Sequence, residues 1–198
     1  MLSNSMSATK ISKASIAVNR FGYGAQNDEL VIASKDPQAW IKSQLLPLAF
    51  TGDFPHSNDI LIEHAAYIKE KKRRKQQQSK NSQSGSMQDE QKPKNFSRLA
   101  LRNMSADTLN QTIASTNSVS WRLLDFFSNH FSVSANGQLM AGLAATLERE
   151  AIAPNLLRHF EDMLLAVEQH PAMLIYLNNE KSFGPNSRLA KKQKKGLN

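Results

Sequence analysis

Apolar residues recur at spacings of three and four in every apolar stretch of the chain, which is the pattern of helices that bury one face. The alternation of apolar and polar residues between hairpin dipeptides, which is typical of strands, does not occur. Asp36-Pro37 and His170-Pro171 each place a capping residue before a proline, which marks the start of a helix. The pattern predicts an all-α protein, an irregular bundle of about eight helices.

Caps and apolar stripes place the predicted helices along the chain. A first helix near residues 10–19 ends at Arg20-Phe-Gly-Tyr-Gly, where glycine can take the left-handed geometry of a helix terminus. Further helices are expected at about 28–34, 37–45, 58–75, 96–115, 119–131, 139–153, 155–169 and 171–178, with the cations of 71–75 on a solvated helix end. The helix that starts after Ser57 or Asn58 has an apolar stripe before cations take over, made of Leu61, His64, Ala65 and Ile68.

The net charge of +8 comes from two segments of the chain. Residues 69–94 carry nine cations and three anions and residues 188–198 carry five cations and no anion, so the remainder has a net charge of −3. Residues 76–94 are polar throughout, which predicts a disordered basic insertion. The expected organisation is a helical part over 1–75, the insertion over 76–94, a second helical part of the same domain over 95–180, and a flexible, disordered basic tail over 181–198.

Residue types and spacings leave few classes of chemistry open. The chain has no cysteine, which excludes disulfides, thiolate nucleophiles, thiolate zinc sites and iron–sulfur clusters. No two histidines have metal-ligand spacing and the glycine-rich loops that bind phosphates are absent, so we expect no metal and no cofactor. The clustered carboxylates are expected on solvated faces or as partners of Arg149 and Arg158. These carboxylates are Glu148 with Glu150, and Glu161 with Asp162.

Location and partners are indicated by two further features. The N-terminus lacks the charged start and apolar run of a signal peptide, and no stretch approaches the ~20 apolar residues of a membrane span, so the sequence as written predicts a cytoplasmic protein. The cations from Lys71 to Lys75 could contact phosphates or an anionic membrane. No aromatic residue interleaves with them to stack on bases, so a nucleic-acid partner is not favoured.

Three stretches of the chain carry a resemblance to a known family. They are Ala17-Val-Asn-Arg-Phe-Gly-Tyr-Gly followed by Ala39-Trp-Ile-Lys-Ser-Gln-Leu, then Phe126-Phe-Ser-Asn-His-Phe-Ser-Val, and then residues 160–179, which contain His-Pro-Ala-Met-Leu-Ile-Tyr-Leu-Asn-Asn. Together they resemble the N-terminal part of the bacterial domain of unknown function 1800 family. By this resemblance, motif positions fall on Arg20, Asn129, His130, His170, Pro171, Met173, Tyr176 and Asn179.

The resemblance also implies where the chain departs from the family. Family members often carry Trp-His where this chain has Phe127-Ser128, which removes one candidate ligand or proton carrier. The family pattern is expected to continue past Asn198 into a longer C-terminal half, so the resemblance implies a truncated chain.

Three functional hypotheses follow. The first is a helical N-terminal segment of a larger bacterial protein of unknown function, a scaffold or interaction part that is inactive alone and self-associates. Its partners would be its own C-terminal half or a sulfatase-like neighbour protein, as the resemblance implies. The second is a hydrolase-like site, completed by that half, with Arg20, His130 and His170 as candidate catalytic residues, so enzymatic activity stays open. The third is a weak electrostatic nucleic-acid binder.

Overall fold

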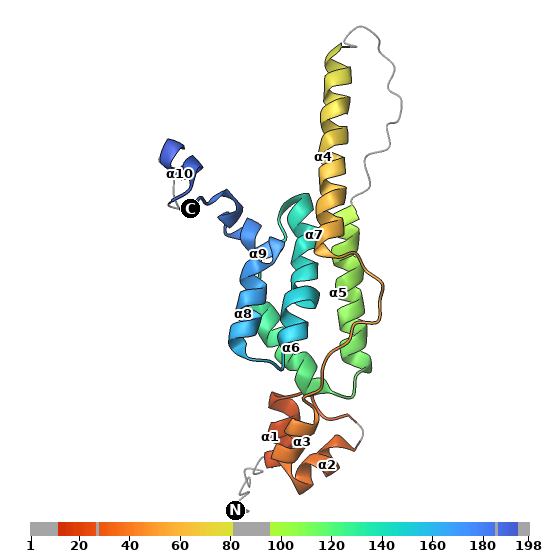
Figure 1. Ribbon diagram of the computed structural model, residues 1–198. Helices are drawn as coiled ribbons and strands as arrows, with labels where there is room; N and C mark the ends of the chain where they lie inside the picture. The colour runs from red at the N-terminus through yellow and green to blue at the C-terminus, as the bar shows by residue number, and fades with distance from the viewer. Residues whose placement is uncertain (1–11, 27, 81–95, 185, 194–198) are drawn as a thin grey trace, which may run out of the picture.

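The computed structural model describes residues 12–26, 28–80, 96–184 and 186–193 (Figure 1). Within these residues the secondary structure is entirely helical and contains no strand, which confirms the all-α prediction. The α-helices are α1 Lys13–Arg20, α2 Glu29–Lys35, α3 Pro37–Ser43, α4 Ser57–Lys80, α5 Phe96–Ala114, α6 Ser118–His130, α7 Gly137–Leu147, α8 Phe160–Gln169, α9 Pro171–Tyr176 and α10 Arg188–Gln193. The shorter elements are a π-helical turn, η1 Glu148–Ile152, and two 3-10 turns, η2 Ala153–Asn155 and η3 Asn179–Lys181. No helix in the described part of the chain is both long and apolar enough to span a bilayer.

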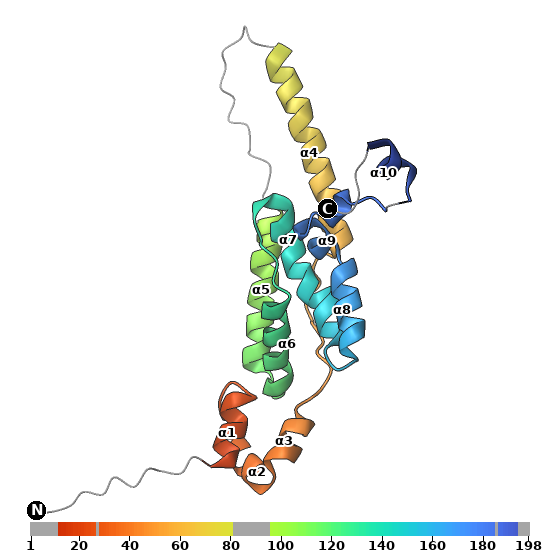
Figure 2. The same ribbon diagram turned by 90° about the vertical axis from the view of Figure 1, so that its left-hand side faces the viewer.

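The first three helices form a small core at one end of the molecule (Figures 1 and 2). The Ser12 hydroxyl caps α1 by accepting from the amide of Ser15, and the Asp36 carboxylate caps α3 by accepting from the amides of Gln38 and Ala39. The residues that fill this core are Ala14, Ala17, Val18, Ala33, Trp40 and Val119. Because Val119 belongs to α6, this core also anchors the start of that helix.

An extended segment, 44–56, leads from the small core along the bundle to α4 (Figure 1). Buried Ser120 fixes its start, because the hydroxyl accepts from the amide of Leu46 at 2.9 Å and lies 3.0 and 2.8 Å from the carbonyl oxygens of Gln44 and Leu46. Further along, Leu48 and Phe50 pack against the larger core. The segment is thereby held on the bundle, although it has no regular secondary structure.

The larger core lies where α4, α5, α6, α7, η1, α8 and α9 meet. Its fully buried side chains include Ile60, Leu124, Leu143, Ile152 and Val167. A close approach of helices is set by Gly142 of α7, because a Cβ there would lie 2.7 Å from Cγ2 of Ile60 and 3.2 Å from Cβ of Ser97. The absence of a side chain on Gly142 therefore lets α4 and α5 pack directly on α7.

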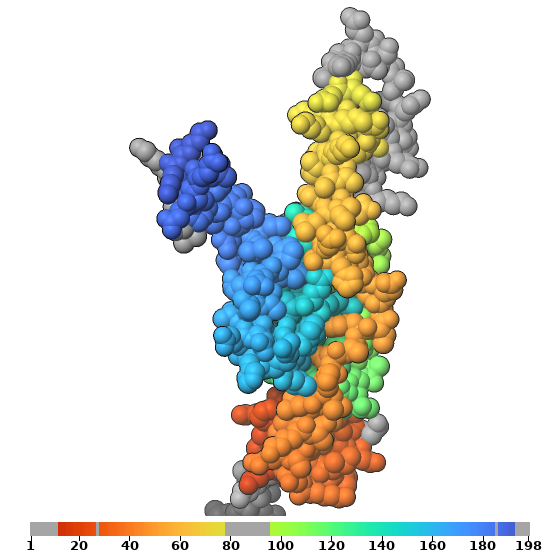
Figure 3. All heavy atoms as spheres, viewed as in Figure 1, coloured from red at the N-terminus to blue at the C-terminus, as the bar shows by residue number. Residues whose placement is uncertain are grey.

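The structure corrects the stripe expected on α4. Ile60 is the fully buried residue of this helix, whereas Ala65 and Ile68 are exposed. The first turns of α4 pack on α7, whereas the second half of the helix stands away from the described bundle (Figure 3). Apolar side chains in that second half therefore have no neighbouring helix that would bury them. The helix is also longer than expected and continues to Lys80, so residues 76–80 of the predicted insertion are helical. The rest of that insertion lies outside the described residues.

One prediction near the C-terminus also needs correction. A helix was expected from Asn155, but α8 begins at Phe160, because the chain passes through η1, η2 and a turn around Pro154 first. Asn155 is buried and its side-chain amide donates to the carbonyl of Ala151. The described part of the predicted tail, 181–198, includes the short helix α10, and residues 194–198 lie outside the described residues.

Candidate functional site

Three consecutive charged residues occupy the π-helical turn η1, and each binds a different set of partners. Such turns are rare and are frequent at functional sites. The carboxylate of Glu148 accepts hydrogen bonds from the hydroxyls of Thr108 and Ser128, both at 3.0 Å. Because Thr108 belongs to α5 and Ser128 to α6, Glu148 joins the two helices that flank α7.

Arg149 of the turn is nearly buried, with 9% of its side chain exposed. Its Nη2 donates to the Met104 carbonyl and the Asp107 carboxylate, both at 2.8 Å, and to the Thr108 hydroxyl at 3.1 Å. The guanidinium also lies 4.1 Å from the ring centroid of Phe50 and 4.8 Å from that of Phe54. Arg149 therefore ties α5 to the extended segment through an ion pair and cation–π contacts.

The carboxylate of Glu150 gathers donors from two further elements. One oxygen accepts from the amide of Ser57 at 2.8 Å and lies 3.2 Å from Nδ1 of His56, and the other lies 3.1 Å from Nε2 of His170. Burial alone would raise the pKa of Glu150, but the hydrogen bonds from His170 and Ser57 outweigh it and hold the pKa at about 2. Glu150 therefore stays ionised throughout the neutral range.

His170 is held by both ring nitrogens. Its Nδ1 accepts from the amide of Ala172 at 3.1 Å and so caps α9, which is the capping role open to it from the sequence. An acceptor nitrogen carries no hydrogen, so Nε2 is the donor to Glu150. His170 is 6% exposed and joins the start of α9 to the π-helical turn.

These contacts overturn the expectation for Glu148 and Glu150. Neither residue lies on a solvated face and neither pairs with Arg149, whose carboxylate partner is Asp107. The sequence signal that could have found them is the run Glu148-Arg-Glu inside an apolar stretch, which is typical of charges that are paired in the interior.

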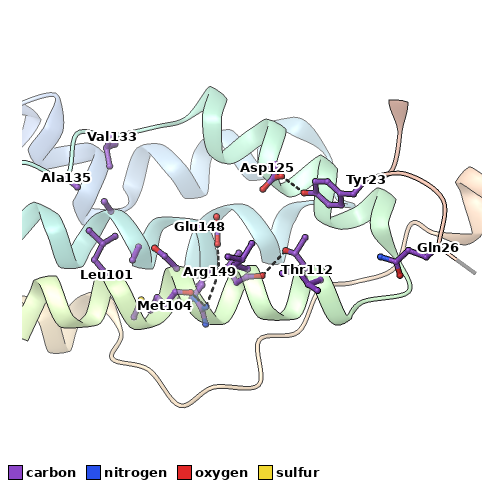
Figure 4. A pocket seen from close by; sticks show the side chains of 16 residues that line it. Tyr23, Gln26, Leu101, Met104, Thr112, Asp125, Val133, Ala135, Glu148 and Arg149 are labelled. Carbon is purple, nitrogen blue, oxygen red and sulfur yellow. Dashed lines mark hydrogen bonds between the residues drawn. The ribbon is translucent and has the colours of Figure 1, made fainter. Parts of the chain in front are cut away.

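A groove of about 700 Å³ opens beside the same turn (Figure 4). It is lined by α5, α7 and η1, by Asp125 of α6 and by Val133 and Ala135 of the loop between α6 and α7. Tyr23 and Gln26, from the loop between α1 and α2, lie at one end (Figure 4). We call this hollow the α5–α6 groove.

A polar pair stands at that end of the α5–α6 groove. The Tyr23 hydroxyl donates to the carboxylate of Asp125 (Figure 4), and the Arg122 guanidinium lies 5.6 Å from the centroid of the Tyr23 ring. Burial, then the hydrogen bond to Asp125 and its negative charge, raises the pKa of the Tyr23 phenol well above its ordinary value. The phenol therefore keeps its proton and remains a donor.

The structure places the three candidate catalytic residues in three different surroundings. His170 belongs to the Glu150 cluster, His130 is exposed at the end of α6, and Arg20 is exposed at the end of α1. Among the described residues, no hydrogen bond, ion pair or ring contact joins any two of them.

The other motif positions are spread over the surface and the core. Pro171 is the first residue of α9, and Met173 of the same helix is buried in the larger core. Asn129 is exposed beside His130. Tyr176 ends α9 and Asn179 begins η3, and both are exposed.

His130 lies in a set of rings that we call the aromatic face, in which Phe126 and Phe160 are exposed and Phe131 is buried. Its imidazole stacks on Phe126 at a centroid distance of 6.3 Å and meets the edge of Phe131 at 4.7 Å. Phe127 contacts Phe126, Phe131 and Phe160, so the rings form one continuous set across α6 and the start of α8. Phe126 is 62% exposed and Phe160 is 52% exposed.

Within the described residues, no group of three or more histidine and carboxylate side chains is arranged to hold a metal ion. No curated protein and no solved structure matches the chain. A family model described as "Protein of unknown function (DUF1800)" matches residues 16–198. The match covers nearly the whole chain, including all three motif stretches and the π-helical turn, and the chain therefore belongs to the DUF1800 family of proteins of unknown function.

Proposed function

We propose that this chain is an interaction segment that binds another polypeptide through its aromatic face. The observation that carries the proposal is the continuity of the rings Phe126, Phe127, His130, Phe131 and Phe160, two of which expose more than half of their surface. Single exposed apolar residues are common on protein surfaces, but contiguous apolar patches mark interaction sites.

The chemistry of the aromatic face favours a polypeptide partner with apolar side chains. Phenylalanine rings have large areas and few rotamers, so they bury apolar surface at a small entropic cost. Leu164 lies one helical turn after Phe160 on α8 and is also exposed, which extends the face along that helix. An amphipathic helix laid against α6 and α8 would cover these side chains.

Self-association tests this proposal, because a second copy can cover the aromatic face when no other partner is present. We expect the average mass of the wild type in sedimentation equilibrium to rise with concentration. The double variant Phe126→Ser/Phe160→Ser should stay monomeric, since it removes the two most exposed rings of the face.

A matched control comes from α2. Val31→Ser removes an apolar side chain that is 59% exposed and lies in the small-core end of the molecule, so it should self-associate like the wild type. Loss of self-association in Val31→Ser as well would point to general surface hydrophobicity and contradict the proposal.

An enzymatic role has weaker support from the contacts. Both ring nitrogens of His170 are engaged, one with the Ala172 amide and one with Glu150, so neither is free to take a proton from a substrate. His130 has no carboxylate partner among its described contacts, which are the rings of Phe126 and Phe131. A hydrolase-like site would need further groups beside these histidines.

A further inference from the structure

We propose that the α5–α6 groove binds a small organic cation, an amine or quaternary ammonium attached to an apolar body. This goes beyond the proposed binding of a polypeptide, and it uses other residues. The proposal rests on three observations, which are the size of the groove, its apolar walls and the sign of the charges that face it.

The size and walls of the groove suit a small molecule. Its volume of about 700 Å³ falls within the roughly 300–1,000 Å³ of ordinary ligand pockets. Half of its lining side chains are apolar, including Leu101, Leu109 and Ile113 of α5. Ala144 and Ala145 of α7 also line it, and their small side chains leave the space open. An apolar body would bury these surfaces on binding.

The charges in the groove favour a cation. Asp125 and Glu148 both line it, and their hydrogen-bond donors are the neutral hydroxyls of Tyr23, Thr108 and Ser128. None of these donors carries a positive charge that would offset the two carboxylates. An ammonium group placed between them would be attracted by each carboxylate.

The one basic side chain that lines the groove is already neutralised. Arg149 pairs with Asp107 at 2.8 Å and packs against Phe50 and Phe54 of the extended segment. Arg122 does not line the groove but approaches the ring of Tyr23. Because the Tyr23 ring already has this guanidinium over it, the preference for a cation rests on the two carboxylates and not on the ring. A carboxylate or phosphate ligand would instead meet two like charges.

A pair of probes of equal shape and opposite charge tests the proposal. The probes are 4-phenylbutylammonium and 4-phenylbutyrate, and binding to the full chain is followed by backbone amide shifts in NMR titrations. We expect the ammonium probe to bind at least about tenfold more tightly than the carboxylate, with shifts centred on α5 and η1. Equal affinity for the two probes, no binding of either, or shifts centred elsewhere would overturn the proposal.

Variants separate the charge effect from the shape of the groove. Asp125→Asn and Glu148→Gln should each weaken binding of the ammonium probe about tenfold. Asp125 is exposed, so its variant keeps the test valid if the more enclosed Glu148→Gln perturbs folding. Ala145→Phe should abolish binding by filling the groove. The matched control Glu63→Gln removes an exposed carboxylate on α4, and a loss of affinity there equal to that in Asp125→Asn would contradict the assignment.

Binding of the ammonium probe is expected to be independent of the aromatic face. The variant Phe126→Ser/Phe160→Ser should bind 4-phenylbutylammonium like the wild type, because neither residue lines the groove. A failure of self-association would therefore leave this proposal standing, and a failure of ammonium binding would leave the polypeptide-binding proposal standing.

Discussion

At the scale of single residues, Glu150 of the π-helical turn joins the starts of two other helices. It receives the amide of Ser57 at the start of α4 and the ring of His170 at the start of α9. The His170 cap could be predicted, since a residue before proline at a helix start has few other roles. The burial of Glu150 could not, because sequence spacing alone does not distinguish a solvated helical face from an interior π-helical turn.

The pKa of Glu150 gives a prediction for stability. Its pKa is lowered from 4.5 to about 2, so the folded state gains stability from the ionised carboxylate above pH 4.5, and this gain is lost as the pH falls toward 2. Glu150→Gln should destabilise the protein at pH 7 by about 1 to 3 kcal/mol, because it weakens the hydrogen bonds to His170 and Ser57. Urea denaturation at pH 7 and pH 3 measures both effects.

The same measurement on Glu63→Gln is the control for Glu150→Gln. Glu63 is exposed on α4, so its variant should have the stability and acid sensitivity of the wild type. If Glu150→Gln lost as much stability between pH 7 and pH 3 as the wild type does, the role assigned to Glu150 would be wrong.

At the scale of elements, caps and prolines decided which helices the sequence could place. α3 starts at Pro37 and α9 at Pro171, as expected, since each has a capping side chain and a proline at its first position. The start of α8 was wrong because Pro154 lies inside a 3-10 turn and does not open a helix. α4 continues past the expected end at residue 75 to Lys80, and the pairs of Glu70 with Arg73 and Arg74 support the helix through the cationic run before it.

The crossing of α4 and α7 at Gly142 gives a second prediction. Gly142→Ala should destabilise the protein by about 1 to 3 kcal/mol, although alanine favours helices, because its Cβ would lie 2.7 Å from a carbon of fully buried Ile60. The energetic coupling between residues 142 and 60 is measured by thermal unfolding of this variant, of Ile60→Ala and of the double variant. Gly142→Ala should lower the stability of the Ile60→Ala variant by less than it lowers the stability of the wild type. A stabilising Gly142→Ala would mean that the helices do not approach closely here.

At the scale of the whole molecule, two cores support a set of open surfaces. The helical class could be predicted from the sequence, because the spacing of apolar residues reports the period of a helix directly. The open surfaces could not, because the spacing marks Phe126 and Phe131 as equally apolar, whereas one is 62% exposed and the other is buried. Which face of a helix stays uncovered depends on tertiary packing, and the proposed interaction depends on that face.

Hydroxyl-radical footprinting of the wild type tests the polypeptide-binding proposal most directly, because it reports the exposure of individual phenylalanine rings. We predict that Phe126 and Phe160 are oxidised readily in dilute protein and become protected as the concentration rises, while Phe21 near the small core, also exposed, changes little. Unchanged oxidation of Phe126 and Phe160 across a concentration range over which the protein associates would show that association uses another surface, and would contradict the proposal.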